Sequence, residues 1–164
     1  MVAVLGVAEY DRHERASGEA LELAGETLAG FGADTAQSVA FRSAQLVEMH
    51  LLGGHLDAAE AIVGFGLEHL DRVAAWPMEP KLWHLRAEVA RAQRRWTDGE
   101  RCLAQMERTI RPDGDPALTS DELRRQNHMY RARLGTARAQ NFLELGLLDR
   151  CAELIAAADI EARK

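Results

Sequence analysis

The stretch "HLLGGHLDAAEAI", residues His50 to Ile62, decides the fold of this chain. Its first letters end one apolar pattern and its last letters begin another, and Gly53 and Gly54 stand between the two. Consecutive glycines interrupt a helix because ordering a glycine backbone costs more entropy than ordering any other residue. The stretch therefore predicts a bend that joins two helices.

The two histidines of the stretch, His50 and His55, raise a metal site as the alternative. Histidines that bind one metal from a single helical face are three or four residues apart, whereas these are five apart and the glycines separate them. A metal ion would then need ligands from elsewhere, such as Glu48 or Asp57. We therefore expect His50 to pack between helices and His55 to lie at the turn, with no metal and no other cofactor.

The pattern after the bend recurs twice further along the chain. Residues at offsets of 3, 7, 10 and 14 from Leu56, Trp96 and Leu148 are again apolar or small, which is one stripe of an amphipathic helix. The stripes are Leu56, Ala59, Val63, Gly66 and Leu70, then Trp96, Gly99, Leu103, Met106 and Ile110, and finally Leu148, Cys151, Ile155, Ala158 and Ala162. Three helices that share one buried face indicate a repeated unit.

A second helix is expected before each of these three, at residues 41–52, 81–94 and 121–145. Segments that recur every twenty to fifty residues are typical of repeats, which bury their apolar faces only by stacking. We predict a single domain over residues 1–164, built of helical pairs at 38–73, 78–111 and 119–163. A partial N-terminal repeat at 1–33 brings the total to about seven helices.

The composition favours an all-α protein, because Ala and Leu dominate the apolar residues and aromatic residues reach only 5%. The net charge of −6 disfavours nucleic acid as a partner, although the segment between Lys81 and Arg138 is basic. No apolar window is long enough for a membrane span, and the two cysteines lack a disulfide or metal-ligand spacing. We expect a soluble cytoplasmic protein, and the excess of Arg over Lys indicates a GC-rich bacterial gene.

These features resemble the tetratricopeptide repeat in a degenerate form. The likeness rests on Gly54-His55-Leu56 with Ala59, on Trp83 with Ala87 and Gly99, on Gly146-Leu147-Leu148 with Cys151, and on Pro112. The period is longer and less even than in that family, and is similar to the arrays of bacterial LuxR- and MalT-type regulators. The resemblance covers residues 38–164 and implies a right-handed stack of antiparallel helical hairpins, an α-solenoid.

The resemblance further implies a concave groove, lined by the first helix of each pair, that binds a protein or peptide partner. The residues placed on that side are Gln45, Glu48, Leu52, His84, Glu88, Arg91, Arg133, Thr136, Gln140 and Glu144. The Lys and Asn set with which some members clamp a peptide C-terminus is absent. Arg91 and Arg133 could instead bind an acidic side chain of the partner through their guanidinium groups.

The expected function is a non-catalytic interaction module, because no nucleophile has an identifiable base and orienting acid near it. The alternative is a ligand-sensing or regulatory domain of a bacterial transcription regulator or signalling ATPase. Self-association is a further alternative, since a stack of helical pairs that does not close on itself exposes an apolar end. Arg124, Arg131 and Arg138, spaced seven residues apart, form either a solvated helix face or a grip for an acidic ligand.

Overall fold

The computed structural model describes residues 36–70 and 77–163, and within these ranges it contains six α-helices and no strand. The helices are α2 (Ala36–Gly53), α3 (Leu56–Glu68), α4 (Met78–Ala92), α5 (Trp96–Thr109), α6 (Asp121–Glu144) and α7 (Leu148–Ala162). The predicted all-α class is confirmed for this part of the chain. The helix expected within residues 1–33 lies outside the described residues.

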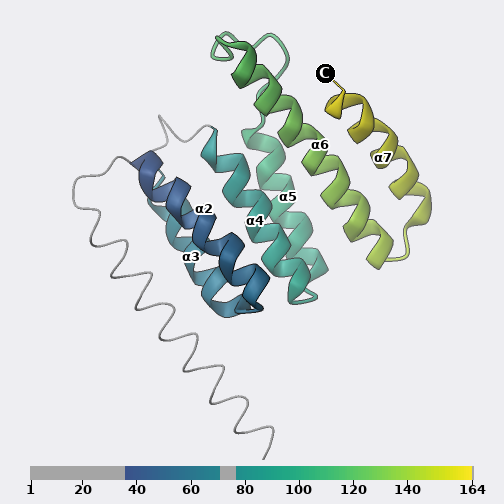
Figure 1. Ribbon diagram of the computed structural model, residues 1–164. Helices are drawn as coiled ribbons and strands as arrows, with labels where there is room; N and C mark the ends of the chain where they lie inside the picture. Colours follow the sequence, from purple (N-terminus) through teal and green to yellow (C-terminus); the bar gives the residue numbers. More distant parts are fainter. Residues whose placement is uncertain (1–35, 71–76, 164) are drawn as a thin grey trace, which may run out of the picture.

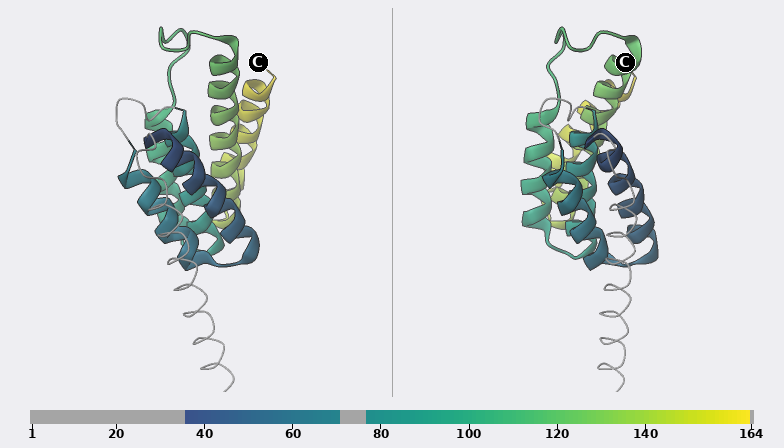
Figure 2. Two further views of the ribbon diagram at one scale, coloured as in Figure 1. Left: turned by 60° about the vertical axis from the view of Figure 1, so that its left-hand side comes forward. Right: turned by 90° about the vertical axis from the view of Figure 1, so that its left-hand side faces the viewer.

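Each described helix packs against its neighbour in sequence, so that α2 lies against α3, α4 against α5 and α6 against α7. Figure 1 shows the three pairs side by side in chain order, from the blue end to the yellow end. The pairs also touch one another, because α4 packs against both α2 and α3, and α6 packs against both α4 and α5. Figure 2 shows that α6 and the connection before it, residues 110–120, extend beyond the ends of α4 and α5.

The bend between the two helices of each pair has one geometry, repeated three times. Its central residue has a positive φ in every case, 75° at Gly54, 58° at Arg94 and 76° at Gly146. The next amide then donates to the carbonyl five residues before it. These bonds run from His55 to His50 at 2.9 Å, from Arg95 to Ala90 at 2.8 Å and from Leu147 to Phe142 at 2.7 Å. A left-handed residue with this bond is the Schellman motif that ends helices, so the predicted bend is confirmed and recurs.

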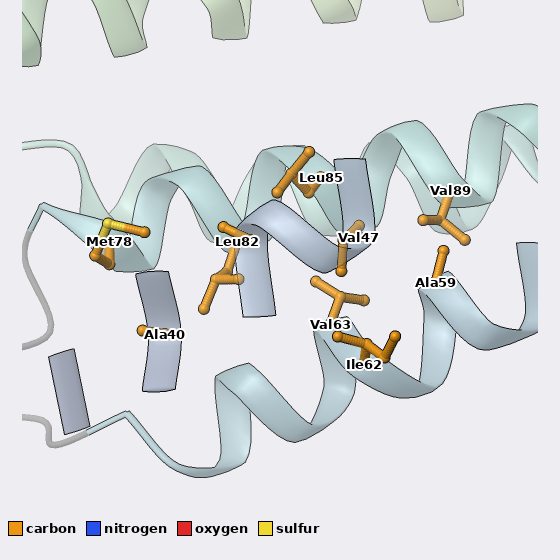
Figure 3. Packing of buried hydrophobic residues seen from close by; sticks show 10 residues of the cluster. Ala40, Val47, Ala59, Ile62, Val63, Met78, Leu82, Leu85 and Val89 are labelled. Carbon is orange, nitrogen blue, oxygen red and sulfur yellow. The ribbon is translucent and has the colours of Figure 1, made fainter. Parts of the chain in front are cut away.

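The apolar core of the first half is shared by α2, α3 and α4. Figure 3 shows Val47 of α2, Val63 of α3 and Leu82 of α4 converging in it, and all three side chains are fully buried. A second cluster joins Leu103 and Met106 of α5 to α6. Since each cluster crosses from one pair to the next, burial of the second helix in a pair depends on the first helix of the following pair.

The first two predicted stripes are confirmed, because their central members are buried and their outer members are partly buried. The third stripe is wrong in part: Cys151 and Ala158 are buried, whereas Leu148 is 63% exposed and Ile155 is 58% exposed. Val63, at the position equivalent to Ile155, is buried where α3 and α4 meet. In the described part of the chain, α7 has extensive contact with α6 alone, so the outer side of its stripe faces away from any described helix.

Two helices begin earlier than the sequence predicts. Helix α4 begins at Met78 rather than at residue 81, and therefore includes Pro80 in its first turn. Proline is tolerated there because the first amides of a helix have no intrahelical acceptor. Helix α2 begins at Ala36, five residues before the predicted start at 41.

Helix α3 offers a matched pair of glycines that tests the close approach of α2 to α3. A Cβ at Gly66 would stand 2.8 Å from the Cβ of Ser43, which moves only with the backbone of α2, whereas a Cβ at Gly64 would meet nothing within 4 Å. We expect Gly66→Ala to lower the free energy of unfolding by about 1–3 kcal/mol through overpacking. Gly64→Ala should raise it by about 0.5–1 kcal/mol through helix propensity. Urea denaturation measures both, and equal effects would contradict the close contact.

The bend at Arg94 offers a second test, because a side chain there occupies the left-handed region that glycine adopts at the other two bends. Arg94 is exposed, and its Cβ is strained by the positive φ. We expect Arg94→Gly to raise the free energy of unfolding by about 0.5–1 kcal/mol. Gly146→Ala, the reverse change at the equivalent position, should lower it by a similar amount. Thermal denaturation of the two variants measures this, and a destabilised Arg94→Gly protein would argue against the shared bend.

Candidate functional site

A hollow lies between α4 and α6, and the end of α7 contributes to its lining. It has a volume of about 580 Å³. Six of the ten predicted groove residues line it, namely His84, Glu88, Arg91, Arg133, Thr136 and Gln140. Because the first helices of the second and third pairs supply all six, the structure brings this part of the predicted groove together.

A second hollow of about 500 Å³ continues toward α2. It shares Glu88, Arg91 and Gln140 with the first, and it adds Leu52 and Glu144 from the predicted set. The shared residues are linked to one another, since the guanidinium of Arg91 donates to the carboxylate of Glu88 and to the side-chain oxygen of Gln140. This link ties α4 to α6 at the point where the two hollows meet.

The remaining two predicted residues, Gln45 and Glu48, line neither hollow. Glu48 forms an ion pair with Lys81, whose Nζ lies 3.0 Å from the Glu48 Oε1, and this pair joins α2 to α4. Gln45 is exposed on α2. Glu48 therefore lies at the contact between α2 and α4 rather than in either hollow.

Burial and two cations control the charge of His84 at the wall of the larger hollow. Burial lowers its pKa to about 4, and the positive charges of Arg133 and then Arg91 act in the same direction. Its Nδ1 is buried and has no hydrogen-bond partner among the described residues. Burial raises the pKa of Glu88, against the opposing effect of Arg91. Because its pKa is about 4, the imidazole of His84 is neutral at pH 7.

The basic side chains around the hollow differ in whether a carboxylate contacts them. Arg91 is paired with Glu88, Arg125 with Glu122 at 3.1 Å, and His128 with Glu161 at 2.9 Å. Arg133 is exposed and makes no ion pair or hydrogen bond with any residue that the structure describes. The lining therefore has one guanidinium whose charge is not compensated within the described part of the chain.

Sequence reasoning missed the lining residues nearest to the start of α6 and those from α7. Met129 and Arg125 continue the spacing of Gln140, Thr136 and Arg133 backward along one face of α6, so extending that face would have found them. Glu161 and Ala162 reach the hollow only because α7 folds back along α6. No local signal in the sequence marks that contact.

The arginine row of α6 is used mainly within the protein. Arg138 pairs with Glu100 and Glu107 of α5, each at 2.9 Å. Arg131 pairs with Asp113 at 2.7 Å and donates to the carbonyl of Arg111 at 2.6 Å. Since these contacts join α6 to α5 and to the connection before α6, Arg131 and Arg138 hold helices in place rather than lining the hollow.

The two histidines of the first bend lie close to each other, with ring centroids 5.8 Å apart in an edge-to-face arrangement. Burial and the neighbouring His55 lower the pKa of His50. Residues 36–70 and 77–163 contain no cluster of three or more His, Cys, Asp or Glu side chains placed to hold a metal ion. None of the described helices has the length and apolar content needed to cross a membrane.

Comparison of the chain with protein-family models, curated proteins and solved structures finds no match. The geometry and charges of the hollows are therefore the features that bear on function.

The low pKa of His84 gives a test of this geometry. Because the folded state holds the imidazole neutral down to about pH 4 while the unfolded chain binds a proton near pH 6.5, His84 should make the protein less stable as the pH falls between these values. We expect Arg133→Gln to raise the pKa of His84, since it removes a nearby positive charge. Arg125→Gln should leave it unchanged. NMR titration of the His84 ring measures both, and an unmoved pKa in Arg133→Gln would contradict the coupling.

Proposed function

We propose that the chain is a non-catalytic protein-interaction module, a right-handed stack of tetratricopeptide-like helical hairpins that binds a segment of another protein in its groove. The main support for this proposal is that the residues predicted for the groove on α4 and on α6 line one hollow. In a stack of this kind, the first helices of successive hairpins line the concave side, which is where such a segment would lie.

The repeat interpretation is supported by an ion pair that recurs between pairs. Glu60 lies four residues after the start of α3 and pairs with Arg86 of α4 at 3.2 Å. Glu100 lies four residues after the start of α5 and pairs with Arg138 of α6 at 2.9 Å. The two arginines each precede a buried alanine, Ala87 or Ala139. Equivalent residues thus make equivalent contacts across both boundaries.

The character of the lining supports a protein segment as the ligand. Apolar surface from Met129, Ala132 and Ala137 lies beside charged and amide groups, a mixture that suits side chains and backbone together. The continuation into the second hollow provides length for an extended chain. A non-catalytic role agrees with the hydroxyl of Thr136, which donates to the carbonyl of Ala132 at 3.0 Å and so stays engaged with its own helix.

A ligand-sensing domain is the second candidate, and the size of the hollow favours it. Pockets for small molecules commonly measure about 300–1,000 Å³, and the larger hollow lies within that range. In that case the chain would serve as the regulatory domain of a bacterial transcription regulator or signalling ATPase. The same hollow would then bind a metabolite instead of a peptide.

Selection of peptides from a random displayed library, followed by fluorescence anisotropy with the native chain, tests the leading proposal. We expect Thr136→Trp, which fills the hollow, to weaken binding of the selected peptides at least about tenfold, a loss of about 1.4 kcal/mol. Thr97→Trp is the matched control, because Thr97 is exposed on α5 and lines neither hollow. Peptides that bind both variants equally would contradict a groove site. Saturable binding of small metabolites without any peptide would favour the sensor.

A further inference from the structure

The uncompensated charge of Arg133 is unusual within its surroundings. Arg91, Arg125 and His128 line the same hollow, and each already has a carboxylate partner. His84 of α4 lines the same hollow, and its buried Nδ1 has no partner in the described part of the chain. Arg133 and His84 thus line the same space, whose lining also contains apolar surface and the carboxylates of Glu88 and Glu161.

We propose that Arg133 and His84 form an anion-accepting subsite that takes an acidic side chain of the bound segment together with one proton. The proposal rests on the proposed function, since it identifies the chemistry of the partner at that groove. Arg133 supplies a planar guanidinium that can bind a carboxylate through two parallel hydrogen bonds. His84, once protonated, adds a second positive charge beside the same carboxylate.

The charges around His84 explain why the proton arrives only with the anion. Arg133 of α6 and Arg91 of α4 oppose protonation most, Glu48 of α2 favours it less strongly than either arginine opposes it, and Lys81 of α4 opposes it least. Glu88 lines the same hollow but is already paired with Arg91. A carboxylate bound at Arg133 would cancel the largest of these opposing charges, so the affinity of His84 for a proton rises when the subsite is occupied.

An internal acidic residue fits the subsite better than a chain terminus. The hollow that contains Arg133 continues past Gln140 into the second hollow, so a segment bound at Arg133 has room to extend. Met129 and Ala132 provide apolar contact for the aliphatic part of an Asp or Glu side chain or for its neighbours. The partner expected here is therefore a segment with an Asp or Glu flanked by apolar residues.

NMR titration of the native chain with sodium formate, against sodium chloride at the same ionic strength, tests the subsite without any peptide. We expect formate to shift the His84 ring resonances saturably and to raise the pKa of His84 above its value of about 4 in chloride. Arg133→Gln should abolish both effects, Arg133→Lys should retain part of them, and Arg125→Gln should retain them fully. Identical titrations in formate and chloride would overturn the subsite.

The selected groove peptides separate this inference from the proposed function. Replacement of their acidic residue by its amide should weaken binding to the native chain at least about tenfold. The same replacement should have little effect on binding to Arg133→Gln, and amidation of the peptide C-terminus should have little effect on either protein. Peptides that bind the groove equally well with Glu or Gln would overturn the subsite while leaving the groove intact. A larger effect of C-terminal amidation would overturn the choice of an internal residue.

Discussion

The structure depends on one backbone constraint, the left-handed residue that ends the first helix of each pair. Its positive φ, at Gly54, Arg94 and Gly146, is followed by an amide that donates back to the carbonyl of the fifth residue before it. That bond ends the first helix and reverses the chain in the same way in all three pairs. Residues at equal distances from the bends consequently make corresponding contacts at the two boundaries between pairs, whereas Ile155 of α7, equivalent to Val63 of α3, stays exposed.

The recurring contacts between pairs follow from this equivalence. Because α3 and α5 leave their bends alike, Glu60 and Glu100 meet arginines at corresponding positions of the next first helix. Val63 and Leu103 likewise fall where α3 meets α4 and where α5 meets α6, and both are almost fully buried. The opposite faces of α4 and α6 remain free of these contacts. Those faces line the hollows. The candidate site is therefore formed by residues of α4 and α6 that do not take part in these contacts between pairs.

Much of the fold could be predicted from the sequence, because the bends and stripes are local patterns. Gly53 and Gly54 mark a bend, and six of the residues predicted for the groove line one hollow between α4 and α6. The failures have physical causes. Arg94 carries the left-handed conformation without glycine, so composition does not reveal it. The exposure of Ile155 depends on whether another helix packs against α7, and the periodic pattern of a sequence does not show which helix packs against a given face.

The charges of the basic segment between Lys81 and Arg138 divide into two groups with different roles. Arg86, Arg131 and Arg138 lie at boundaries between helices, where each meets a carboxylate from another element. Their local charge is therefore used to fix helix positions, and the excess of basic residues in this segment does not by itself make a binding surface. Arg133 differs because the spacing of α6 places it among the residues lining the hollow, away from those boundaries. Its charge instead lowers the pKa of His84 and would attract an anionic group bound between α4 and α6.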